Sequence, residues 1–141
     1  MRSARALVEE AMALVTTLDT AQALALLGQP EVVFVDIREP GEREREGSIP
    51  AAFNAPRGLL EFWFDATAGT GKSALTRPDA HYVLFCAAGW RSALAARTLQ
   101  DMGVRQVAHL GGGFDAWKAA GAPTTGGAPA STHSPAAAGT S

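Results

Sequence analysis

The sequence predicts an α/β fold, a single domain with a mainly parallel central sheet of about five strands and helices on both faces. The first observation is the order of the elements, because short runs of β-branched and aromatic residues alternate with segments of helical periodicity. The second is that the strand candidates are apolar along their whole length, which favours strands buried on both faces. A chain of 141 residues is long enough for one such domain and its core.

Helix caps and helix breakers define the elements of the first half of the chain. Asp19 or Thr20 can cap a helix, and Gly28 and Pro30 can end it. Alternating charges over 39–47 predict a loop or short helix with solvated side chains. In order, we predict a helix over 3–13, a β-leaning run over 14–18, a helix from 19 or 20 to 27, a buried strand over 32–36, the charged segment 39–47, an irregular stretch over 49–56 and an apolar, aromatic segment over 59–64.

The second half begins with a loop rich in Gly and Thr over 66–78. Its strongest helix candidate has apolar residues at helical spacing and ends at Gly103. In order, we predict a strand over 81–85, a turn over 87–89, a helix over 90–102, a strand over 105–110, a glycine turn over 111–113 and a helix over 114–120 that Gly121 and Pro123 end.

These elements divide the chain into three parts. Residues 1–13 form an N-terminal helical extension, and residues 14–123 form the domain. Residues 124–141 contain almost only Ala, Gly, Pro, Ser and Thr. Because such a segment buries too little apolar surface to offset the entropy of ordering, we expect a disordered tail.

Composition argues against several classes of function. A net charge of −2 and a pI near 5.9 argue against nucleic acid as a partner. The acidic Glu9 and Glu10 interrupt the apolar run that a signal peptide needs, and no run is long enough to span a bilayer. We therefore expect a cytoplasmic protein without a membrane partner. One cysteine and three scattered histidines predict no disulfide, no metal and no cofactor.

The candidate site is Cys86, which directly follows a predicted buried strand and precedes a short loop of small residues and a helix. Ligands gather beyond the carboxyl ends of parallel strands. Backbone N–H groups at the start of a helix can bind an anion, and such surroundings favour the nucleophilic thiolate. Arg91 adds a positive charge and a planar set of donors.

A simpler interpretation stays open for each of these side chains. A lone cysteine at the end of a buried strand is often an inert, small apolar residue. Trp90 can equally be a core residue, and Arg91 a surface residue or the partner of a carboxylate of the fold.

Three separated segments together resemble the rhodanese family, over residues 17–123. They are the stretch Asp36-Ile37-Arg38-Glu39-Pro40 with Glu42, Gly47, Ile49-Pro50, Ala52 and Asn54, the loop Cys86-Ala87-Ala88-Gly89-Trp90-Arg91-Ser92, and the closing segment Gly111-Gly112-Gly113-Phe114-Asp115-Ala116-Trp117.

The resemblance implies a sulfurtransferase. A sulfane sulfur from a donor such as thiosulfate would join Cys86 as a persulfide and pass to cyanide, a small thiol or a protein thiol. No second thiol is present, so the acceptor must be external. The backbone amides of the six loop residues would bind the sulfur anion, and the pair Asp36 and Arg38 would provide structural support. Ser48 stands where the family usually has a histidine. The loop residues expected to bind the sulfur are Ala87, Ala88, Gly89, Trp90, Arg91 and Ser92.

Several alternatives remain. A rhodanese-like domain can be a regulatory binding module without catalysis. Cysteine phosphatases have a similar loop, with one residue more between Cys and Arg and a histidine where this chain has Phe85. Residues 66–73 match a relaxed phosphate-loop pattern, but Pro78 follows too soon for a long helix, and we expect Lys72 to be solvated. Residues 57–63 either line the entrance to the site or form an amphipathic helix on the sheet.

Overall fold

A computed structural model describes residues 1–128, and the remainder of the predicted tail, 129–141, lies outside the described residues. The core is one five-stranded sheet in the order β1-β5-β4-β2-β3, in which every neighbouring pair is parallel. This is the predicted fold class. The strands are β1 (Thr16–Leu18), β2 (Val32–Asp36), β3 (Phe53–Asn54), β4 (His81–Phe85) and β5 (Val107–Leu110).

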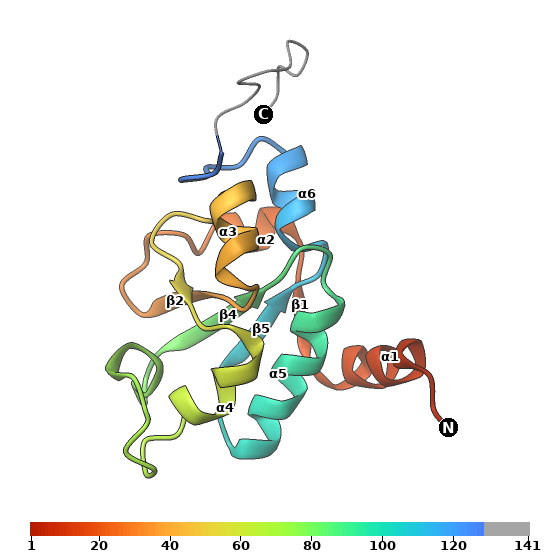
Figure 1. Ribbon diagram of the computed structural model, residues 1–141, viewed down its shortest axis with the longest axis vertical. Coiled ribbons are helices and arrows are strands. Elements are labelled where there is room, and N and C mark those ends of the chain that lie inside the picture. Colours follow the sequence, from red (N-terminus) through yellow and green to blue (C-terminus); the bar gives the residue numbers. More distant parts are fainter. Residues whose placement is uncertain (129–141) are drawn as a thin grey trace.

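Helices cover both faces of this sheet (Figure 1). The cluster under α4 and α5 contains one set of strand residues, and the cluster under α2 and α6 contains the other. The helices are α1 (Ala4–Leu14), α2 (Thr20–Leu24), α3 (Pro40–Glu46), α4 (Leu60–Trp63), α5 (Trp90–Met102) and α6 (Gly113–Ala119), with 3₁₀ turns η1 (Arg57–Leu59) and η2 (Ser73–Leu75).

Strand β4 shows why the strand candidates are apolar throughout. Tyr82 and Leu84 enter the cluster under α4 and α5, whereas Val83 and Phe85 enter the cluster on the opposite face. Successive side chains of a strand point to opposite faces, so a strand covered by helices on both sides needs apolar residues at every position. Cys86 continues this alternation and lies on the face of α4 and α5.

Most predicted elements are present, with shifted ends. The N-cap of α2 is Asp19, whose carboxylate accepts a hydrogen bond from the amide of Gln22 while the Gln22 side chain accepts from the amide of Asp19. The helix ends at Leu24 rather than at the predicted Leu27. The α-helical pattern stops there because the amides of Leu26 and Leu27 bond to carbonyls three residues earlier, as in a 3₁₀ turn.

The irregular stretch predicted over 49–56 contains a fifth strand. Phe53 and Asn54 form β3, which pairs with Val35 and Asp36 at the edge of the sheet. Two residues are too few to show a period of two, so no sequence pattern could indicate this strand.

The tail predicted from Thr124 begins with an ordered stretch. Thr125 and Ser48 exchange two backbone hydrogen bonds of 2.9 Å, and the amide of Ala128 bonds to the carbonyl of Arg45 at 3.0 Å. The chain therefore passes back over the end of α3 before it leaves the described residues. Composition alone cannot indicate these contacts, because they use only backbone groups.

The N-terminal extension forms α1, which projects sideways from the domain and packs against α5 (Figure 1). Its buried side chains, Val8 and Ala11, pack with Ala93 and Leu94 of α5. Ser3 caps the helix by accepting a hydrogen bond from the amide of Ala6. Within residues 1–128, none of the helices is both long and apolar enough to cross a membrane.

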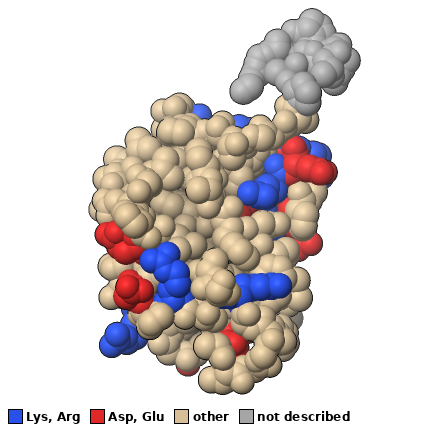
Figure 2. Space-filling model, turned by 90° about the vertical axis from the view of Figure 1, so that its left-hand side faces the viewer, with Lys and Arg blue, Asp and Glu red and all other residues tan. Residues whose placement is uncertain are grey.

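The stretch that resembles a phosphate loop does not open a long helix. Only the three-residue turn η2 follows it. Lys72 is exposed, as expected, and places its ammonium nitrogen 4.8 Å from the centre of the Trp63 ring. On the face shown in Figure 2, acidic and basic side chains lie close to each other rather than in separate regions.

Candidate active site around Cys86

Cys86 lies directly after β4, at the carboxyl end of the sheet, and only 1% of its surface is exposed. Its sulfur accepts hydrogen bonds from two amides of the following loop, Gly89 N at 3.2 Å and Ser92 N at 3.4 Å. Of the six loop residues predicted to bind the sulfur, these two donate to it. Two backbone N–H groups near the start of α5 therefore point at the sulfur, and the sulfur-binding role of the loop stays a prediction.

The closing glycine segment determines which way the loop amides point. The amides of Phe114 and Asp115 donate to the carbonyls of Cys86 and Ala87, at 2.8 and 3.0 Å. The Ser92 hydroxyl donates to the carbonyl of Gly89 at 3.3 Å. These carbonyls are held by partners away from the sulfur, which leaves N–H groups of the same loop free to face it.

Two glycines permit this close packing of the loop on the closing segment. Gly89 has φ +103°, and a Cβ atom there would overlap the carbonyl oxygen of Gly111. Gly113 has φ +67°, and a Cβ atom there would overlap the carbonyl oxygen of Ala87. Both positions therefore require glycine for conformation and for space.

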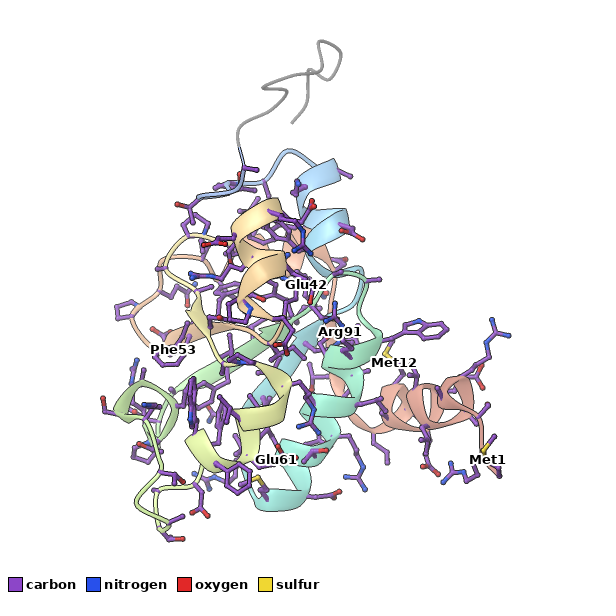
Figure 3. All side chains as sticks on the ribbon, in the orientation of Figure 1. Met1, Met12, Glu42, Phe53, Glu61 and Arg91 are labelled. Carbon is purple, nitrogen blue, oxygen red and sulfur yellow. The ribbon has the colours of Figure 1, made fainter. Side chains whose placement is uncertain are left out.

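Arg91 faces away from the core and pairs with a carboxylate from another element. Its two terminal nitrogens donate to the two oxygens of Glu42, both at 2.9 Å, and Figure 3 shows these side chains meeting between α3 and α5. This hydrogen bonding lowers the pKa of Glu42 to about 2. It also raises the pKa of Arg91, and the nearby Cys86 acts in the same direction. Within the segment expected to be a solvated face, Glu42 is thus partly exposed and also forms an ion pair.

The other predicted loop residues contribute backbone and surface. Ala87 is partly buried, Ala88 is exposed, and the indole of Trp90 is 54% exposed. The alternative that Trp90 is a core residue is therefore wrong. An exposed tryptophan next to a buried cysteine places a large apolar surface beside the site.

A buried histidine contacts the active-site loop through Ser92, and it was not among the residues predicted for the site. His109 on β5 is fully buried, with Nδ1 2.9 Å from the Ser92 hydroxyl and Nε2 3.0 Å from the Thr17 hydroxyl. Burial lowers the pKa of His109 to about 4, so the imidazole is neutral near pH 7. Its only sequence signal is its position in a buried strand, where a polar residue needs a partner.

Asp36 and Arg38 form the buried ion pair that the resemblance implies. The Asp36 carboxylate accepts from Arg38 Nε at 2.9 Å, from Arg38 Nη2 at 2.8 Å and from the Ser48 hydroxyl at 2.8 Å. Arg38 also donates to the carbonyl of Gly47 at 2.7 Å, and its guanidinium carbon lies 4.7 Å from the Phe114 ring centre. The pair thus joins the end of β2 to the end of α3 and to α6.

Segment 57–63 is a helix packed on the sheet. Leu60 is fully buried in the same cluster as Cys86, while Phe62 is 58% exposed. Arg57 pairs with Glu61 at 2.8 Å. Across residues 1–128, the structure contains no group of His, Cys, Asp or Glu side chains that could hold a metal ion.

The rhodanese-like domain model matches residues 19–120 of the chain. The thiosulfate sulfurtransferase GlpE of Pseudoalteromonas translucida is 31% identical over 105 residues, which cover 71% of this chain and 86% of that protein. An uncharacterized protein of Synechocystis sp. is 37% identical over 97 residues, 68% of this chain. That match covers 48% of the Synechocystis protein, so the chain spans about half of its length.

A solved structure from Rhodopseudomonas palustris has the same fold, with a TM-score of 0.85 and 48% identity over 89% of this chain and 96% of that one. That protein is described as being of unknown function and as a possible tyrosine phosphatase. The family match covers the strand end with Asp36, the loop after Cys86 and the closing glycine segment. The chain belongs to the rhodanese-like domain family.

Proposed function

We propose that the protein is a sulfurtransferase that moves a sulfane sulfur from thiosulfate, through a persulfide on Cys86, to an external acceptor. The observation that carries the proposal is the pair of loop amides that donate to the Cys86 sulfur. Amides fixed in this direction stabilise negative charge on sulfur without having to reorganise. The sulfurtransferase name of the Pseudoalteromonas relative supports the same assignment.

The first step forms the persulfide. The Cys86 thiolate attacks the outer sulfur of thiosulfate, the bond between the two thiosulfate sulfurs breaks, and sulfite leaves with the bonding electron pair. The product is a Cys86 persulfide anion, whose negative charge replaces the charge of the thiolate. The loop amides therefore stabilise an anion before and after the step, and the guanidinium of Arg91 provides a positive charge beside an incoming dianion.

The second step passes the sulfur on. Cyanide or a thiol attacks the outer sulfur, the bond to Cys86 breaks, and Cys86 leaves as the thiolate. Because Cys86 is the only cysteine, the acceptor must come from outside the chain. We place this chemistry in the cytoplasm, where a single free thiol stays reduced.

The description of the Rhodopseudomonas structure gives phosphatase activity as the second candidate. Four residues separate Cys86 from Arg91, which makes a short loop. A phosphoryl group has three equatorial oxygens to bind, so a short loop favours the smaller sulfur atom.

The test is a steady-state assay with thiosulfate and cyanide. We expect wild-type protein to produce sulfite and thiocyanate in equal amounts, and Cys86→Ser to produce neither. A parallel assay with p-nitrophenyl phosphate should show no turnover that depends on Cys86. Turnover of the phosphate ester by wild type but not by Cys86→Ser, without thiocyanate, would replace this proposal with the phosphatase.

A further inference from the structure

A cleft of about 450 Å³ lies between α1 and the loop that follows Cys86. One wall consists of side chains of α1, among them Arg5, Glu9 and Met12, and the other contains Gly89 and Trp90. The volume is in the range of small-molecule sites. Helix α1 lies outside residues 19–120, so this wall is not part of the stretch that the family model matches.

The geometry of α1 turns one set of side chains toward the loop. Arg5, Glu9 and Met12 are spaced four and three residues apart, which places them on one side of a helix. Packing of Val8 and Ala11 against α5 fixes the rotation of the helix. In Figure 3, Met12 lies on the part of α1 that is nearest to the start of α5.

The charged groups of this cleft are available to a ligand. Arg5 and Glu9 lie one helical turn apart, and within residues 1–128 neither forms a salt bridge. By contrast, Glu10 of the same helix is joined at 3.0 Å to Arg2, which precedes the helix. The cleft therefore offers one positive and one negative group, both on exposed residues one helical turn apart.

The remaining surface of the cleft is apolar and partly open. Trp90 is 54% exposed and Met12 is 40% exposed. A flat aromatic ring and a flexible thioether suit a short carbon chain. Together with Arg5 and Glu9, they match a small molecule that has a carboxylate, an ammonium group and an apolar stem.

The cleft adjoins the reacting sulfur through one residue. Gly89 lines the cleft, and its amide donates to the Cys86 sulfur at 3.2 Å. In a persulfide, the outer sulfur lies about 2 Å beyond the cysteine sulfur. A ligand held beside Trp90 is thus next to the loop that carries the transferable sulfur.

We propose that this cleft binds the sulfur acceptor, and that the acceptor is a small zwitterionic thiol of the amino-acid type. The proposal rests on the sulfurtransferase function proposed above. The acceptor's carboxylate pairs with Arg5, its ammonium group pairs with Glu9, and its stem lies on Trp90 and Met12. Its thiol releases a proton to the solvent, and the resulting thiolate attacks the outer sulfur of the Cys86 persulfide. The bond to Cys86 breaks, Cys86 leaves as thiolate, and the acceptor becomes a persulfide.

The kinetic test starts from protein loaded with thiosulfate and freed of excess donor. Loss of the added sulfur is followed by intact mass after addition of L-cysteine, 2-mercaptoethanol or cyanide. We expect Arg5→Gln to raise the half-saturating concentration of L-cysteine about tenfold, the equivalent of one charge-assisted hydrogen bond. It should leave discharge by 2-mercaptoethanol and by cyanide unchanged. Arg2→Gln, which lies just before the helix and outside the cleft, is the matched control.

A binding test does not depend on catalysis. S-methyl-L-cysteine cannot accept sulfur, yet it carries both charges, and we expect it to shift the NMR signal of the Trp90 indole N–H in wild type but not in Arg5→Gln. No shift, or equal effects of Arg5→Gln and Arg2→Gln, overturns the cleft as acceptor site. Absence of any loaded sulfur would instead count against the proposed function, and the binding test still decides the cleft.

Discussion

Two arginine–carboxylate pairs hold the segment that follows β2, and they differ in their exposure to solvent. The side chains of Arg38 and Asp36 are 1% and 0% exposed, whereas those of Arg91 and Glu42 are 44% and 26% exposed. Both pairs make two hydrogen bonds between guanidinium and carboxylate. The same chemical contact therefore occurs once inside the protein and once at its surface.

The difference separates a structural role from a binding role. A buried charge that loses its partner is strongly destabilising, because no water can replace the partner. An exposed pair contributes little, since water and salt compete with it. Arg38 can therefore be exchanged only at a large loss of stability. Arg91 can leave Glu42 for an anionic substrate at a small loss.

The largest effect is expected when the buried pair is broken. Asp36→Ala leaves the Arg38 guanidinium buried without its carboxylate and should lower the free energy of unfolding by about 3 to 5 kcal/mol. Urea denaturation measures this change, and Glu42→Ala is the matched control at the exposed pair. Equal destabilisation by both variants would show that burial does not distinguish the pairs.

The next effect concerns the other buried polar group of the site, His109. Its pKa is about 4 in the folded protein and about 6.5 in an unfolded chain. Between these values the unfolded state binds more protons, so stability rises with pH through this window and is lost as pH falls from 6.5 toward 4. The loss is on the order of 3 kcal/mol.

Urea midpoints at several pH values between 4 and 7 test this expectation, with His109→Asn as the comparison. The variant should be less stable at pH 7 and should lack most of the pH dependence in this window. An unchanged slope in the variant would assign the dependence to other groups.

A smaller loss of stability is expected when the Ser48 hydroxyl, which donates to the buried Asp36 carboxylate, is removed. Ser48→Ala removes one of the donors to the Asp36 carboxylate but leaves the bonds from Arg38. We expect a loss of about 1 to 3 kcal/mol, the range for a hydrogen bond to a charged group. The midpoint should fall between those of Glu42→Ala and Asp36→Ala, while persulfide loading is retained. Loss of loading with intact folding would mean that Ser48 acts on the sulfur chemistry.

The smallest change in stability is expected at the exposed pair, where kinetics give the better readout. Since the pKa of Glu42 is about 2, the pair stays charged throughout the usable pH range. Glu42→Gln should cost less than about 1 kcal/mol of stability. It releases Arg91 and should lower the KM for thiosulfate by up to about fivefold, the equivalent of about 1 kcal/mol. Arg91→Gln should raise the KM, and a raised KM in Glu42→Gln would contradict this role.

The sequence indicates those parts of the structure that depend on local patterns. Helix α5 has its predicted bounds, Trp90 and Met102, because glycines on both sides end a clear helical period. The position of Cys86 follows from a continuous apolar strand and a loop of small residues. These signals lie within a few residues of the features they predict.

Contacts between distant segments carry no such signal. Glu42 and Arg91 meet across 49 positions of the chain, and His109 reaches Thr17 across 92. The alternating charges around Glu42 are typical of a solvated surface, so its partner is visible only in the folded chain. In the same way, Thr125 is held by backbone hydrogen bonds that composition does not reveal.

The measurement that tests the account most directly is the intact mass of the protein after incubation with thiosulfate and removal of the excess. Wild type should gain the mass of one sulfur atom, lose it again when cyanide is added, and release thiocyanate. Cys86→Ser should keep its original mass. An unchanged mass of the wild-type protein, or an equal gain in the variant, would contradict the assignment of Cys86 as the sulfur carrier.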